Sequence, residues 1–138
     1  QVVNLGKRYG VKVLIENVGL RTKNNVLFDL PEYVALFDIF PQAGALLDTG
    51  HAHVNGWDIP AVVKALGGRL AACHVHDNDG SGDAHLPVGQ GDIDWKAYFG
   101  AVKKYAPQAT QVFEYCCGFN NTKDLEAHIA ELKAKYKL

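Results

Sequence analysis

Residues 44–51 read Gly-Ala-Leu-Leu-Asp-Thr-Gly-His, a short apolar run that ends on an aspartate. Three further stretches have the same form, and each ends on a residue that can bind a metal ion or move a proton. They are Val11–Glu16, Leu70–His74 and Thr110–Glu114. Short, nearly continuous apolar runs indicate strands that are buried on both faces, as in parallel sheets.

Segments with apolar residues at helical spacing alternate with these runs. Asp58 and Asp94 stand where N-caps are expected, and Pro31 stands near a helix start. The predicted helices are Pro31–Phe40, Ile59–Leu66, Trp95–Tyr105 and Leu125–Tyr136, with a further short helix at Val2–Arg8. A strand-helix unit with its return loop takes about 30 residues or more. The alternation therefore predicts an α/β fold with four βα units, right-handed crossovers and a parallel sheet.

The composition is that of one globular domain over residues 1–138. The chain is 48% hydrophobic and 21% charged, with a net charge of −1, which excludes a disordered or fibrous protein. The near-neutral charge argues against a nucleic-acid backbone as the main partner, and no run of about 20 apolar residues predicts a membrane helix. The odd count of three cysteines predicts a reducing, cytoplasmic setting.

Two of the cysteines, Cys116 and Cys117, are adjacent in the sequence. A disulfide between neighbouring residues strains the backbone between them. We therefore expect both to be packing residues rather than a redox pair.

The residues that end the four predicted strands are the candidate site. In a parallel sheet the carboxyl ends of the strands lie at one edge, where α/β folds place their active sites. Considered singly, an acidic residue at the end of a strand is most often a helix cap or a solvated loop residue, and a single histidine in a strand is most often a core residue. Three acids and a histidine together call for a balancing cation, and oxygen with imidazole suits Mn²⁺, Mg²⁺, Zn²⁺ or Co²⁺. The predicted ligands are Glu16, Asp48, His74 and Glu114.

The loops after the second and third predicted strands are rich in histidine. Five of the six histidines lie between positions 51 and 85. One of these loops carries Asp83 and His85 in an Asp-x-His arrangement. Histidines with only structural roles would be scattered along the chain, so the clustering indicates function.

Four motifs in this order resemble those of the xylose-isomerase-like TIM-barrel superfamily. The motifs are Ile15–Asn17, Leu47–His51, His74–Asn78 and His85–Trp95. That superfamily holds sugar-phosphate isomerases and epimerases, ketose epimerases, hydroxypyruvate isomerases, inosose dehydratases and apurinic endonucleases of the endonuclease IV type. The resemblance covers nearly the whole chain and implies the C-terminal half, four βα units, of a (β/α)₈ barrel.

The resemblance also implies roles for individual residues. In the ketose-epimerase branch His51 would contact the substrate, and one divalent metal ion would be held by Glu16, Asp48, His74 and Glu114. In the endonuclease branch a further zinc ion would be held by His51, Asp83 and His85. The epimerases commonly carry a substrate-binding arginine in the loop after the metal-binding histidine, and residues 77–82 contain none. This departure counts against a true ketose epimerase.

The leading hypothesis is a metal-dependent isomerase or epimerase of a sugar or sugar phosphate. Glu16 and Glu114 would remove and return a carbon-bound proton through an enediolate, and His51 would hydrogen-bond the oxygen where charge develops. The alternatives are a zinc-dependent apurinic-site phosphodiesterase and a non-catalytic remnant of the barrel. The phosphodiesterase needs a basic groove, whereas the lysines gather mainly in the last two predicted helices.

The chain begins with Gln1 and contains no methionine, so we expect it to be a piece of a longer protein. A closed (β/α)₈ barrel takes about 250 residues, and four parallel strands cannot close. Both edge strands would expose unpaired backbone groups. We therefore expect a partner, either the missing N-terminal half-barrel or a second copy in a homodimer, and little activity without it.

Overall fold

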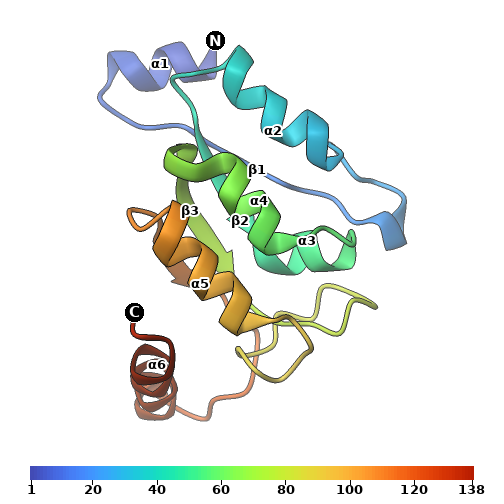
Figure 1. The fold of residues 1–138 in the computed structure, drawn as a ribbon, viewed down its shortest axis with the longest axis vertical. Coiled ribbons are helices and arrows are strands. Elements are labelled where there is room, and N and C mark those ends of the chain that lie inside the picture. Colours follow the sequence, from blue (N-terminus) through green and yellow to red (C-terminus); the bar gives the residue numbers. More distant parts are fainter.

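The computed structural model describes residues 1–138 and shows strands alternating with helices along the chain (Figure 1). Strands that follow one another in the sequence are neighbours in the sheet, and every pair is parallel. The four strands are β1 (Leu14–Glu16), β2 (Gly44–Asp48), β3 (Leu70–Val75) and β4 (Thr110–Phe113). The predicted parallel α/β architecture is confirmed.

Helices precede the first strand, occupy every connection between strands and follow the last strand. They are α1 (Val2–Arg8), α2 (Leu30–Ile39), α3 (Thr49–Val54), α4 (Ile59–Leu66), α5 (Trp95–Tyr105) and α6 (Thr122–Tyr136), with short 3₁₀ turns at Arg21–Lys23 and Gly67–Arg69. The side chains of Asp58 and Asp94 cap α4 and α5, whose bounds are those predicted. No helix combines the length and the apolar sequence needed to cross a bilayer.

Several elements differ from the sequence prediction. Helix α2 begins and ends one residue earlier than predicted, and α6 begins three residues earlier. The first strand begins at Leu14 rather than Val11, because its partner strand offers pairing only from Gly44 onward. Helix α3 was not predicted. It begins directly at the end of β2, because the side chain of Asp48 accepts a hydrogen bond from the backbone N–H of His51 at 2.7 Å.

The core lies between one face of the sheet and helices α2, α4 and α5. The side chains that β2 and β3 direct to this face are fully buried: Ala45, Leu47, Cys73 and Val75. They pack in one cluster with residues of the three helices, including Tyr33, Val62 and Tyr98. Burial of this apolar face is the main force that fixes the helices on the sheet.

The opposite face of the sheet is less covered. Leu14 and Leu46 are half-buried there, and the Val112 side chain of β4 is 43% exposed. The expectation that all four strands are buried on both faces is therefore wrong for β1 and β4. They are the edge strands, and this chain places helices over one face only.

Candidate functional site

The four predicted ligands meet at the carboxyl edge of the sheet. Glu16 and Asp48 end β1 and β2, His74 lies in β3, and Glu114 follows β4 directly. His74 Nδ1 is 3.2 Å from Glu114 Oε2, 3.5 Å from Glu16 Oε1 and 3.8 Å from Asp48 Oδ2. One imidazole nitrogen therefore faces three carboxylates, each from a different strand.

These distances suit a shared divalent ion. Ligand atoms about 2.1 Å from one ion lie about 3.0–3.5 Å from each other in tetrahedral or octahedral geometry. The donor atoms of Glu16, Asp48 and His74 all lie within 4.8 Å of one another. Small side-chain adjustments would bring them into coordination, and Glu114 is close enough to join them. The donor set thus fits a hard or borderline divalent metal ion.

Asp48 is the buried member of this group, with a side chain only 1% exposed. Burial on its own would raise its pKa. The hydrogen bond from His76, the nearby His76 and His51 rings and the His51 backbone N–H together hold the pKa below its ordinary value. Asp48 is therefore a carboxylate even in this buried position.

The side chain of Asn17 links the end of β1 to the end of β2. Its side-chain amide donates to the Asp48 carbonyl oxygen at 3.0 Å and accepts from the Asp48 backbone N–H at 2.7 Å. These two bonds continue the sheet pairing through a side chain. They fix Glu16, the preceding residue, next to Asp48.

The predicted second group is also brought together. His51 Nε2 and His85 Nε2 lie 3.3 Å and 3.2 Å from the same oxygen, Asp83 Oδ2. The other ring nitrogen, Nδ1, of His51 lies 3.1 Å from the Asn17 carbonyl oxygen, and that of His85 lies 3.0 Å from the Glu114 carbonyl oxygen. With a metal ion between them and Asp83, both rings would carry their proton on Nδ1 and bind the ion through Nε2, which is the arrangement of metal-bound histidines.

His85 is held in place by its backbone and by its charged surroundings. Its φ of 47° lies in the left-handed region, which is uncommon for a residue with a side chain. Burial on its own would lower its pKa, but the Glu114 carbonyl and the Asp83 carboxylate raise it above the ordinary histidine value. Negative charge at this position therefore attracts a proton or a cation.

His76 belongs to the site and received no role in the sequence analysis. Its Nε2 lies 3.0 Å from Asp48 Oδ2, and its side chain is fully buried. Strand alternation could have indicated it, because His74 and His76 stand two positions apart and share one face of the chain.

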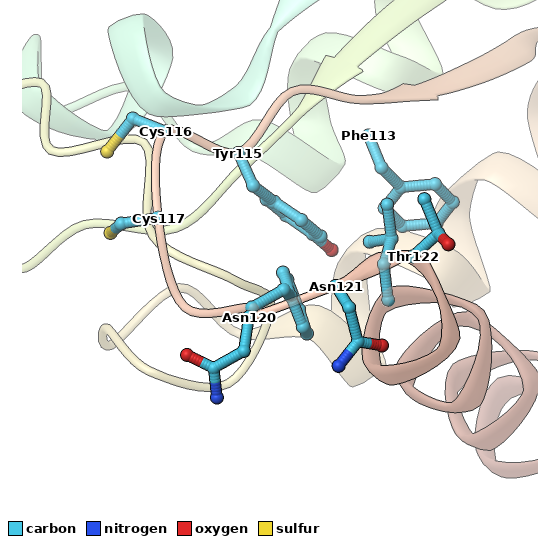
Figure 2. A pocket seen from close by; sticks show the side chains of 9 residues that line it. Phe113, Tyr115, Cys116, Cys117, Asn120, Asn121 and Thr122 are labelled. Carbon is cyan, nitrogen blue, oxygen red and sulfur yellow. The ribbon is translucent and has the colours of Figure 1, made fainter.

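A separate hollow of about 390 Å³ lies beside the segment that joins β4 to α6 (Figure 2). Its lining includes Phe113, Tyr115 and Phe119, and none of the candidate ligands. Figure 2 shows Cys116 and Cys117 in this segment, and both thiols are exposed. The expectation that these cysteines pack in the interior is wrong, because the chain turns away from the sheet after Glu114.

Comparison with known proteins places the chain in a family. The family described as xylose isomerase-like TIM barrel matches residues 1–135. The uncharacterized protein MJ1614 of Methanocaldococcus jannaschii is 31% identical over 104 residues, which are 73% of this chain and 38% of that relative.

Solved structures agree with this match. A D-tagatose 3-epimerase-like protein shares 26% identity at a TM-score of 0.76, covering 98% of this chain and 50% of its own. The TTHB071 protein of Thermus thermophilus, soaked with ZnCl₂, shares 25% identity at a TM-score of 0.68, covering 96% and 48%. The D-allulose 3-epimerase of Methylomonas sp., at 18% identity, a TM-score of 0.78 and 98% and 52% coverage, supports the fold alone.

The chain thus spans about half the length of these structures, and its four βα units correspond to half of a TIM barrel. The match over nearly all of its residues decides the family. The chain belongs to the xylose isomerase-like TIM barrel family.

Proposed function

We propose that the chain is the metal-binding half of an isomerase or epimerase that acts on a sugar or sugar phosphate. One observation carries the proposal: Glu16 and Glu114 approach His74 Nδ1 from the two outer strands, at 3.5 and 3.2 Å. Two carboxylates on either side of one point suit the removal and return of a proton. The similarity to a D-tagatose 3-epimerase-like protein supports the choice of substrate class.

The ligands would be Glu16, Asp48, His74 and Glu114, with Mn²⁺, Mg²⁺, Zn²⁺ or Co²⁺ as the ion. When bound, the ion would stabilise negative charge on neighbouring carbonyl and hydroxyl oxygens of the substrate. Burial separates the roles of the carboxylates. Asp48 is 1% exposed and serves as a ligand only, whereas Glu16 and Glu114 are 29% and 47% exposed and can reach a substrate.

The proton transfer is assigned to these two accessible carboxylates. Glu114, the more exposed, would take the proton from the carbon beside the carbonyl group, and Glu16 would return one from the opposite side. His51 would donate a hydrogen bond from Nε2 to the substrate oxygen, which requires its protonated form because Nδ1 already bonds the Asn17 carbonyl.

The substitution Glu114→Gln tests the assignment in the assembled protein. Gln keeps the size and an oxygen ligand but cannot accept a proton. Mn²⁺ should still bind, whereas exchange of the substrate C–H with D₂O should fall at least about 100-fold. The readout is NMR of ketohexoses and ketopentose phosphates incubated in D₂O.

Glu126→Gln, on the exposed surface of α6, is the matched control and should leave the exchange unchanged. If exchange in Glu114→Gln equalled that of the unmodified protein, the role of Glu114 would be wrong. Failure of the unmodified protein to bind Mn²⁺ would instead favour a non-catalytic remnant of the barrel.

A second candidate, a zinc-dependent apurinic-site phosphodiesterase, draws support from the group around Asp83. His51 and His85 both present Nε2 to this carboxylate, as ligands of a further ion would. The two candidates use His51 differently, as a substrate contact or as a ligand. Two or more zinc ions per chain, with cleavage of a duplex containing an abasic site, would favour the phosphodiesterase.

We also propose that further strands complete the sheet. The exposed Val112 side chain on the face away from the helices supports this proposal. So does the match to the D-tagatose 3-epimerase-like structure, because this chain corresponds to only 50% of that longer chain. The strands would come from the remainder of a longer protein or from a second copy of this chain.

A further inference from the structure

His76 lies between the two groups of candidate ligands and is close to members of both. Its Nε2 is 3.0 Å from Asp48 Oδ2. Its ring stacks on that of His85, with centroids 3.8 Å apart and an interplanar angle of 10°. The side chain is fully buried, so both contacts are made away from bulk water.

The surroundings of His76 pack closely against its ring. A Cβ atom on Gly50 would lie 2.0 Å from His76 Cε1, so the backbone of residue 50 packs directly against the ring. Thr49 Oγ1 accepts from the His76 backbone N–H at 3.2 Å and donates to the His76 carbonyl oxygen at 3.0 Å. The Asp-Thr-Gly-His segment therefore shapes the space that His76 fills.

The stacking argues that His76 orients ligands and is not itself one. A metal ion bound by an imidazole lies near the plane of the ring, along the nitrogen lone pair. Two parallel rings 3.8 Å apart cannot both aim such a lone pair at one ion, although His76, His85 and Glu114 lie close together. Nε2 of His76 is already engaged with Asp48. Its Nδ1 lies 3.8 Å from Asp83 Oδ1, further than the 3.2 Å between His85 Nε2 and Asp83 Oδ2, so His85 is the better ligand of the two.

We propose that His76 is a positioning residue for both groups. Its Nε2–H fixes the second oxygen of Asp48, which leaves the other lone pairs of that carboxylate directed toward the ion. Its ring face supports the ring of His85 beside Asp83. This inference rests on the proposed metal-binding function. Removal of such outer partners typically lowers metal affinity about 10–100-fold.

Two substitutions separate the contributions, with metal binding as the readout. In His76→Gln the side-chain amide can reach the place of Nε2 and donate to Asp48, whereas His76→Leu has no donor. We expect Mn²⁺ affinity, measured by calorimetry, to fall about 10–100-fold in His76→Leu and to be largely restored in His76→Gln. Binding of a second equivalent, measured with Zn²⁺, should weaken in both variants because both lack the ring.

The matched control is His53→Leu, which removes an imidazole that pairs with the exposed Asp92 away from the ligands. It should leave the Mn²⁺ affinity unchanged. If His76→Leu does not fold, as judged by circular dichroism, His76→Asn replaces it, because its shorter amide falls short of Asp48.

The outcomes distinguish the two proposals. Mn²⁺ affinity in His76→Leu or His76→Asn equal to that of the unmodified chain would overturn the role of His76 alone. Absence of Mn²⁺ binding in the assembled, unmodified protein would overturn the metal-binding function and the role of His76 with it.

Discussion

Asp77 shows how much of the site depends on a single buried carboxylate. It is fully buried and accepts hydrogen bonds from Trp95 Nε1 at 2.7 Å and from the backbone N–H of Gly89 at 2.8 Å. The N–H groups of Asn78 and Ile93 add two more, at 3.0 and 3.3 Å. These bonds close the long loop that carries Asp83 and His85.

The substitution Asp77→Asn should therefore destabilise the fold. In this variant an amide NH₂ group would replace one of the two carboxylate oxygens. The buried N–H groups that donate to that oxygen would then face another donor and lose their hydrogen bonds. We expect a loss of about 2–4 kcal/mol in the free energy of unfolding. Urea denaturation followed by tryptophan fluorescence measures it.

The control is Asp79→Asn, an exposed carboxylate two residues further on, which should change the free energy of unfolding by less than about 0.5 kcal/mol. Equal stability of the two variants would show that the Asp77 bonds contribute nothing net.

The contrast between these residues and the predicted ligands shows where sequence reasoning succeeds. Glu16, Asp48 and Glu114 could be placed together because each ends its own apolar run and parallel strands share one carboxyl edge. Strand alternation could indicate that His76 shares a face with His74, but the contacts that give His76 and Asp77 their roles could not be predicted in the same way. They depend on His85 and Trp95, whose approach is decided by the path of an irregular loop.

At the scale of the elements, helix α2 shows that the spacing of apolar residues does not by itself locate the first residue of a helix. The helix begins at Leu30, and Asp29 and Glu32 form a capping box. Asp29 Oδ1 accepts from the Glu32 N–H at 2.8 Å, and Glu32 Oε2 accepts from the Asp29 N–H at 2.9 Å. An acidic cap followed three residues later by Glu is a readable signature of such a start.

Asp29→Ala should lower the free energy of unfolding by about 1 kcal/mol, because it leaves the Glu32 N–H without its acceptor. Asp29→Asn is the matched control, since Asn caps helices about as well as Asp does. Thermal unfolding followed by circular dichroism compares the two. A loss of the same size in both variants would attribute the effect to charge rather than to the cap.

The shortened first strand and helix α3 mark the limits of local patterns. Val11 is apolar but 61% exposed, because strand pairing reaches only from Leu14 onward. Asp48 is both the last residue of β2 and the N-cap of α3. The apolar sequence of β2 therefore gives no indication that a helix follows directly.

At the scale of the whole molecule, the two faces of the sheet are unequal. Helices α2, α4 and α5 cover one face, whereas the Val112 side chain on the other is 43% exposed. Strands β1 and β4 each have one edge without a partner strand. Unpaired edges and exposed apolar side chains favour association with further strands.

We therefore expect the chain on its own to associate rather than to behave as a monomer of 15.1 kDa. Analytical ultracentrifugation at micromolar concentration should show a dimer or larger species, and Val112→Lys should weaken the association, because a charge on the open face cannot be buried without cost. Ile39→Lys is the control, since Ile39 is an exposed apolar residue of α2.

A monomer that unfolds cooperatively and isomerises sugars would contradict the requirement for further strands. Association unaffected by Val112→Lys but weakened by Ile39→Lys would place the contact on the helices instead of the open face of the sheet.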